Sequence, residues 1–337
     1  MTRSPRNGYI DFIKGIAILL VLVGHAIQYC SGSEYFLQRE YYDNPLFKFI
    51  YSFHMPLFMA VSGYLLQCTL SSRTEWDVAL RRLRQLMLPI LSSGILAFVI
   101  KWAVRPVTDV LECVKELWRT CIGNLWFLWA LLYNQLLLLL IRRMGDRIWM
   151  YAVVGVIIYF IPDSNYIPAR YTFLYPFLVL GYMIGKYSLV RIYEGKVRFG
   201  ITIVMLALYV GARCTVLASF GDAWDGIILG GVLQTIRKQF VALFALGWIL
   251  PLLYELYNAL STRHGADFIM KAGRNSLGIY YFQTLIFILV SRVCHLLPSL
   301  GAWGALIGGI VITVECLLLA QWSNRYGIMR LLVWGGK

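Results

Sequence analysis

Charged residues are scarce in this chain of 337 residues. Lys, Arg, Asp and Glu make up 14% of it, against about a quarter of a soluble domain, and apolar residues make up 59%. The apolar residues recur in blocks of roughly 15 to 22 along the whole length, and about 20 such residues cross a bilayer as a helix. This pattern excludes an ordinary soluble domain and predicts an all-α, polytopic membrane helical bundle.

The chain also lacks the short motifs of several enzyme and metalloprotein classes. Its seven cysteines are scattered without a C-x-x-C or another metal-like spacing, so no metal site is expected. No G-x-S-x-G, Walker or dinucleotide-binding glycine motif is present. Nothing in the sequence therefore indicates a permanently bound cofactor.

About ten apolar segments are expected to cross the membrane. Their ranges are 9–29, 47–68, 87–104, 123–141, 148–161, 171–187, 198–218, 238–257, 275–296 and 302–321. No connection exceeds about 20 residues, so residues 1–337 are expected to form a single integral-membrane domain. No small-residue cleavage site precedes Tyr29, which favours an uncleaved first span.

Basic and acidic residues occupy alternate connections. The basic set is Arg3, Arg6; Arg73, Arg81, Arg82, Arg84; Arg142, Arg143, Arg147; Lys186, Arg191, Lys196, Arg198; Arg263, Lys271, Arg274; and Arg325, Arg330, Lys337. The opposite connections hold Glu34, Glu40, Asp43, Asp109, Glu112, Glu116, Asp163, Asp222 and Asp225. The positive-inside rule then places both termini in the cytoplasm, and it explains the net charge of +14 without a nucleic-acid partner. Residues 105–122 alternate charged and apolar positions at helical spacing, which predicts an amphipathic helix on the outer surface.

The first apolar segment carries Asp11, Lys14 and His25. Lys14 and His25 are eleven residues apart, close to three turns, so they share one helix face and lie about 16 Å apart along the axis. Ionisable groups inside a membrane helix are costly and mark a functional site by default.

His54 lies in the second segment, about two turns from its outer end, and the topology puts it at the depth of His25. Histidine can take and return a proton near neutral pH, so the pair is a candidate general-base site. The alternative is that each histidine only makes an interhelical hydrogen bond. Pro56 is expected to kink this span, and Ser62–Gly63 to allow close helix approach.

Other polar residues are candidates for binding a ligand or for supporting the site. Arg81, Arg82 and Arg84 precede Pro89 at the cytoplasmic mouth of the third span, where guanidinium groups can bind phosphate, although topology alone also puts basic residues there. Asn275 and Ser276 could cap the ninth span. Glu315 in the tenth is expected to be buried and to need a partner. The full supporting set is Asp11, Ser62, Trp126, Asn275, Ser276, Tyr280, Gln283 and Glu315.

Taken in order, these residues resemble the membrane acyltransferase family 3, polytopic O-acyltransferases of bacterial cell-surface glycans. The opening D-x-x-K-G-I-A with His25 is one match, and F-H-M-P-L-F-x-x-x-S-G-Y at 53–64 is the second. L-W-F-L at 125–128, Y-P-F at 175–177 and G-R-N-S-L-x-I-Y at 273–280 complete the resemblance. Lys14 stands where arginine is commoner in the family, and Gln283 where many members have histidine.

The resemblance implies acyl transfer at the bacterial inner membrane, from cytoplasmic acyl-CoA, usually acetyl-CoA, to a hydroxyl of a glycan or lipid-linked acceptor. Lys14, Arg81, Arg82 and Arg84 would then bind the CoA phosphates. His25 would deprotonate the acceptor or carry the acyl group, and His54 would orient it or stabilise charge. The residues do not separate direct transfer from an acyl-histidine intermediate.

Two other readings fit the same residues. A transporter or flippase of a glycan or lipid-linked intermediate would also carry intramembrane Asp11, Lys14, His25 and Glu315, although no inverted repeat typical of common transporters is visible. A membrane scaffold that has lost activity is the third reading.

Overall fold

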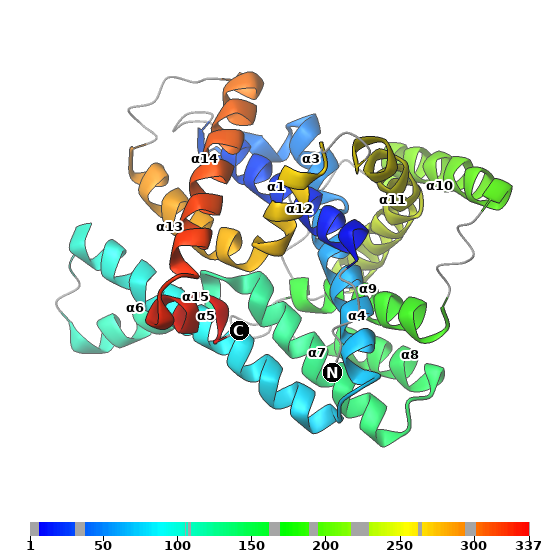
Figure 1. The fold of residues 1–337 in the computed structure, drawn as a ribbon, viewed down its shortest axis with the longest axis horizontal. Helices are drawn as coiled ribbons and strands as arrows, with labels where there is room; N and C mark the ends of the chain where they lie inside the picture. Colours follow the sequence, from blue (N-terminus) through cyan, green and yellow to red (C-terminus); the bar gives the residue numbers. More distant parts are fainter. Residues whose placement is uncertain are drawn as a thin grey trace. The chain divides into compact units, whose positions relative to one another are not determined.

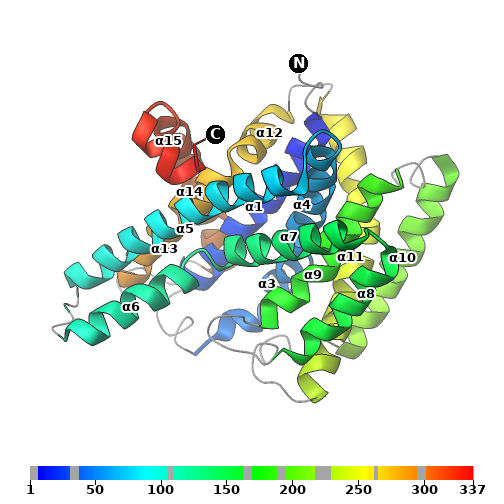
Figure 2. The ribbon, with the colours of Figure 1, turned by 90° about the horizontal axis from the view of Figure 1, so that it is seen from below.

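The structure is a computed structural model that describes residues 7–30, 38–104, 106, 109–161, 169–188, 195–216, 229–261, 265–293 and 301–336. All regular structure within these ranges is helical, as the sequence predicts (Figures 1 and 2).

Each of the ten predicted spans contains a helix. In chain order these are α1 (Gly8–Cys30), α3 (Pro45–Tyr51) with α4 (His54–Leu70), α5 (Glu75–Val104), α7 (Trp126–Met144), α8 (Ile148–Ile157) with η2 (Ile158–Phe160), α9 (Ala169–Lys186), α10 (Gly195–Val216), α11 (Leu229–Ser261), α13 (Ser276–Val293) and α14 (Gly301–Ser323). The predicted amphipathic helix is α6 (Val110–Gly123). Among the described residues, three short helices were not predicted: η1 (Glu40–Tyr42), α12 (Asp267–Arg274) and α15 (Gly327–Trp334).

Six helices in the described residues are long and apolar enough to cross a membrane. They are Gly8–Cys30, Pro45–Leu70, Glu75–Ala103, Trp126–Met144, Val232–Ser261 and Leu306–Ser323. Two more apolar helices, Ile148–Phe160 and Ser276–Val290, are shorter. The protein is therefore an all-helical membrane protein with six candidate spans, while the count of ten and the cytoplasmic termini stay predictions.

Packing divides the chain into two compact units. Unit 1 consists of Met1–Ala17, Tyr42–Glu75 and Tyr133–Arg274. Unit 2 consists of Ile18–Tyr41, Trp76–Leu132 and Asn275–Lys337. Helices α1 and α7 contribute residues to both, and α5 contributes Glu75 to unit 1 and its other residues to unit 2. The single domain expected for 1–337 stays a prediction, and each unit is described by itself below.

In unit 1, two glycines let α4 and α9 pack backbone against backbone. A Cβ atom at Gly63 would lie 2.0 Å from the carbonyl oxygen of Leu178, and one at Gly181 would lie 1.8 Å from that of Ala60. Only glycine fits at such distances, since real Cβ contacts are wider. The close approach predicted for Ser62–Gly63 is confirmed at Gly63.

A second glycine pair joins α1 to α12 in unit 1. A Cβ at Gly15 would lie 2.0 Å from the Ile269 carbonyl oxygen, and a Cβ at Gly273 would lie 1.8 Å from that of Asp11. The K-G and G-R pairs of the two quoted motifs thus supply the small residues that this contact requires.

In unit 2, α13 packs on α14, and α15 packs on both of them. The indole Nε1 of Trp334 donates to Ser323 Oγ at 3.1 Å, and Ser92 Oγ donates to the carbonyl oxygen of Leu332 at 2.9 Å. The short helix α15 is therefore fixed between α14 and α5, as the red and cyan ribbons of Figure 1 show.

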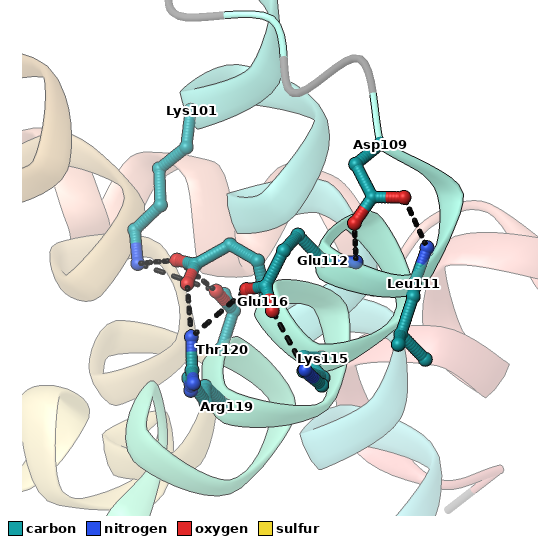
Figure 3. Close-up of polar contacts among 8 residues, drawn as sticks. All are labelled: Lys101, Asp109, Leu111, Glu112, Lys115, Glu116, Arg119 and Thr120. Atoms are coloured by element: carbon teal, nitrogen blue, oxygen red, sulfur yellow. Dashed lines mark hydrogen bonds and ion pairs between the residues drawn. The ribbon is translucent and has the colours of Figure 1, made fainter.

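Helix α6 in unit 2 has one charged row and one apolar row. The carboxylate of Asp109 accepts from the backbone N–H groups of Leu111 and Glu112 at 3.3 Å, which caps the helix (Figure 3). Glu116 pairs with Lys101 of α5 at 3.7 Å and with Arg119 at 3.9 Å. The apolar row, made of Val110, Leu111, Val114 and Trp118, is exposed. The helix itself is confirmed, and its place on the outer surface stays a prediction.

Candidate active site

The cationic end of the predicted stripe lies in unit 1. Asp11 is buried, and its carboxylate lies 3.9 Å from the Lys14 ammonium one turn further along α1. Helix α1 is unbroken from Gly8 to Cys30, so Lys14 and His25 share one face of a single helix, about 16 Å apart along its axis.

His54 begins a helix instead of lying inside one, because the predicted span 47–68 is interrupted between α3 and α4. The helix stops after Tyr51, and Phe53 leaves the helical region with φ −144° and ψ −20°. Pro56 explains the position of the break, because a proline ring collides with the carbonyl four residues earlier, here that of Ser52. A proline in the first turn of α4 is tolerated, since its missing N–H has no helical partner there.

The break also fixes the proton on His54. The buried imidazole places Nδ1 2.7 Å from the carbonyl oxygen of Ile50. A carbonyl can only accept, so Nδ1 carries a proton and donates it to Ile50. His54 is thereby oriented by backbone, in the manner expected for a group that positions or polarises.

His25 lies in unit 2 in a looser setting. The side chain is partly buried, Nδ1 lies 3.3 Å from Gln28 Oε1, and the ring packs 5.5 Å from that of Phe287 and 6.0 Å from that of Tyr29. His25 and His54 belong to different units, so their predicted convergence stays a prediction.

Helix α13 presents Tyr280, Gln283 and Phe287 on one face of unit 2. Tyr280 packs edge to face with Phe127 at 6.2 Å, which joins two of the motifs quoted above. The Thr284 hydroxyl gives its proton to the carbonyl oxygen of Tyr280 at 2.9 Å, so it accepts from Gln283 Nε2 at 3.2 Å.

This bond fixes the Gln283 amide with its oxygen turned away from Thr284. Gln283 is 1% exposed, and its Oε1 has no hydrogen-bond partner among the described residues. An unmet buried acceptor costs about 1–3 kcal/mol, so the oxygen is well placed to accept from a bound molecule.

The remaining supporting residues are placed as follows. Asn275 precedes the first residue of α13, Ser276, and its carbonyl accepts from the backbone of Ile279 at 2.9 Å, which fits the predicted helix start. Ser62 lies partly buried on α4, and Trp126 is the first residue of α7.

Two site expectations need correction. Arg81, Arg82 and Arg84 lie inside α5, which begins at Glu75 and not near 87, because the charged residues of its first turns continue the helix beyond the apolar part. Arg82 is partly buried and donates to Gln85 Oε1 at 3.4 Å, whereas Arg81 and Arg84 are exposed.

Glu315 is exposed on α14 and not buried. The buried row of α14 is Ile312, Cys316 and Ala320, at helical spacing of four. Glu315 stands beside this row, with exposed Val311 and Leu318, so the expected buried acid is wrong.

Sequence reasoning missed a polar network in unit 1, called here the Arg142 network. Arg142 Nε donates to Glu75 Oε1 at 2.8 Å, and its Nη1 donates to Gln67 Oε1 at 3.3 Å and to the Tyr182 hydroxyl at 3.2 Å. Tyr182 in turn donates to Asp146 Oδ1 at 3.0 Å. These side chains come from α4, α5, α7, α9 and the connection after α7, so no spacing along the sequence could reveal them.

Asp146 closes the network. It accepts from Tyr151 at 2.7 Å and pairs with the Lys186 ammonium at 2.8 Å. Partial burial alone would raise the pKa of Asp146, but the hydrogen bonds from Lys186, Tyr151 and Tyr182 outweigh it and hold that pKa below its usual value.

The comparisons with known proteins decide the family. A family model described as an acyltransferase domain matches residues 7–321, nearly the whole chain. The chain belongs to membrane acyltransferase family 3. No solved structure matches it.

Two relatives of this acyltransferase are each named nodulation protein NolL. The one from Mesorhizobium japonicum is 26% identical over 350 residues, which cover 98% of this chain and 91% of the relative. The one from Sinorhizobium fredii is 32% identical over 185 residues, which cover 54% of this chain and 50% of the relative. With its candidate spans and its family, the protein is a membrane acyltransferase.

Proposed function

We propose that this acyltransferase moves an acyl group, most simply acetyl from acetyl-CoA, to a hydroxyl of a cell-surface or exported glycan. The observation that carries the proposal is the unbroken helix α1, which holds Lys14 and His25 on one face about 16 Å apart. A pantetheine arm is of the length needed to bridge these two groups, with the CoA phosphates on the cationic side.

The residues take distinct roles in this proposal. Lys14, with Arg81, Arg82 and Arg84, meets the phosphates of CoA. His25 removes the proton of the acceptor hydroxyl, or carries the acyl group between donor and acceptor. His54, whose Nδ1 donates to the Ile50 carbonyl, orients the acceptor. Gln283 Oε1 accepts a hydrogen bond from the acceptor.

The test uses purified protein in lipid nanodiscs with radiolabelled acetyl-CoA and surface glycan extracted from a strain that lacks the gene. His25→Ala should lower transfer about 10²- to 10⁴-fold, the range of a lost general base. His264→Ala is the matched control, since that histidine has no role in the proposal. Both variants should unfold within about 1 °C of the wild type, because 1 kcal/mol shifts the unfolding midpoint of a chain this long by only about 1–2 °C.

Wild-type acyl transfer by the His25→Ala variant would contradict the role proposed for His25. Absence of acyl transfer by the wild type, together with no stabilisation by saturating CoA, would remove the proposed donor, because a bound ligand at about 100 times its Kd adds ~2.7 kcal/mol.

A further inference from the structure

A second polar cluster of unit 1, called here the Arg213 cluster, lies beside His54. It consists of Ser52, Tyr209, Arg213 and Trp248. The Tyr209 hydroxyl lies 3.1 Å from Ser52 Oγ, and Arg213 Nη1 donates to the same hydroxyl at 3.3 Å, with its guanidinium 5.8 Å from the Tyr209 ring centre. Ser52 is two residues before His54, and the Tyr51 ring lies 4.7 Å from the His54 ring.

The protons of this cluster run in one direction. Ser52 Oγ donates to the carbonyl oxygen of Phe49 at 2.7 Å, so Tyr209 must give its own proton to Ser52. The Tyr209 oxygen then accepts from Arg213. Of the five N–H groups of the guanidinium, one is used in this bond, and the others can donate to a bound group.

Arg213 differs from the other arginine described on its helix in having no ion-pair partner among the described residues. Arg198 and Arg213 lie on the same helix, α10, fifteen residues and therefore about 22 Å apart along its axis. Arg198, near the end of α10 that the sequence predicts to be cytoplasmic, has an ion-pair partner, Glu255. Within the described residues no carboxylate lies at ion-pair distance from Arg213, so no described acid balances its charge.

Trp248 adds a second unmet donor. Its ring lies 5.8 Å from that of Tyr209 and 6.4 Å from that of Phe49. Its indole Nε1 is buried and has no hydrogen-bond partner among the described residues. A buried donor without a partner is unfavourable unless a bound group accepts from it.

We propose that the Arg213 cluster binds an oxyanion, a carboxylate or a phosphate, carried on a sugar of the acceptor. Arg213 and Trp248 both offer donors, and a carboxylate or phosphate accepts two guanidinium N–H groups side by side. The faces of Tyr209 and Trp248 provide the apolar walls that usually surround a few orienting polar groups. The assignment to the acceptor rests on the proposed function, since it places the charged sugar next to His54.

The experiment measures sugar binding without acyl-CoA, so its failure is distinct from a failure of acyl transfer. Wild-type protein in phosphatidylcholine nanodiscs is titrated with galacturonic acid, galactose 1-phosphate and neutral galactose, and the dissociation constant is read from thermal unfolding. At least one anionic sugar should bind more tightly than galactose, and the sugar that binds names the oxyanion.

Arg213→Gln should weaken that binding about 10- to 100-fold, the range for a lost hydrogen bond to a charged group. Arg213→Lys keeps the charge, so its dissociation constant should lie between those of the wild type and Arg213→Gln. This variant preserves the test if the glutamine variant does not fold. Arg237→Gln removes an exposed arginine of α11 in the same unit and should leave binding unchanged.

Three results would overturn the proposal. One is equal binding of galactose and both anionic sugars, or no binding of any. Another is full affinity in Arg213→Gln. The third is stabilisation by phosphatidylglycerol nanodiscs alone that disappears in Arg213→Gln, which would assign the cluster to a lipid headgroup.

Discussion

The Arg142 network of unit 1 and the Gln283 region of unit 2 both place polar groups among apolar helices, and they differ in how these groups are satisfied. In the network, Arg142 meets Glu75, Gln67 and Tyr182, and Asp146 meets Tyr151, Tyr182 and Lys186. At Gln283 the amide nitrogen is used and the oxygen is not. A closed network holds helices together, whereas an open one has capacity left for a ligand.

The two histidines show the same contrast on a smaller scale. His54 is 1% exposed and bonded to a backbone carbonyl at 2.7 Å. His25 is partly buried and makes a 3.3 Å contact with a flexible amide. The first suits a fixed orienting group, and the second suits a group that takes and returns a proton.

Arg142→Gln should produce the largest loss of stability. It leaves Glu75 without its 2.8 Å partner and removes the bond to Tyr182, so unfolding should become easier by about 1–3 kcal/mol. Arg143→Gln, on the exposed side of the same helix, is the control and should change little. Thermal unfolding in detergent measures both, and equal midpoints would show that the network does not hold the helices.

Gln283→Met should leave the stability of the protein unchanged or higher and weaken its binding of the acceptor. The variant has the same length but no amide, so it removes a buried unmet oxygen and should be at least as stable as the wild type. The KM for the acceptor should rise about tenfold, the equivalent of ~1.4 kcal/mol. Gln321→Met on α14 makes the same chemical change outside the proposed site. A lower unfolding midpoint for Gln283→Met at unchanged KM would give Gln283 a purely structural role.

The smallest effect concerns pH. Because the pKa of Asp146 is lower in the folded state, its ionised form stabilises the fold above the unfolded-state pKa of about 4, and this stabilisation is lost as the pH falls through the folded value. The difference in unfolding midpoint between wild type and Asp146→Asn should therefore stay constant from pH 7 to about 5 and shrink below about 4. A difference that persists unchanged to pH 2.5 would contradict the ionised pair.

Hydropathy predicts the helices well where one helix is one apolar run. Helix α1 was expected at 9–29 and lies at Gly8–Cys30, and α6 was expected from its alternating charges. The hydropathy prediction fails at the start of α5, where Trp76, Asp77 and the arginines form a polar extension of the helix. A charged segment reads as a connection by hydropathy, although its backbone continues the helix.

The site was predictable only along single helices. The Lys14–His25 face follows from helical periodicity, and the break before His54 follows from Pro56 once the clash with residue 52 is considered. The Arg142 network and the Arg213 cluster are made of side chains from different helices, so tertiary packing is needed to find them. Glu315 was misplaced because the cost of an acid in a membrane helix says nothing about which face it lies on.

The contact of Gly15 and Gly273 holds α1 against α12 at one level of the helix. Where the backbones of α1 and α12 touch, any lateral shift requires a collision, so that level of the helix is held in place. His25 lies ten residues beyond, about 15 Å along the axis. A tilt of α1 by roughly 5° about this contact would leave Lys14 nearly in place and displace the His25 imidazole by about 1.3 Å, enough to make or lose a hydrogen bond. The glycine contact thus fixes the level of Lys14, and the hydrogen bonding of His25 depends on the angle that α1 takes beyond it.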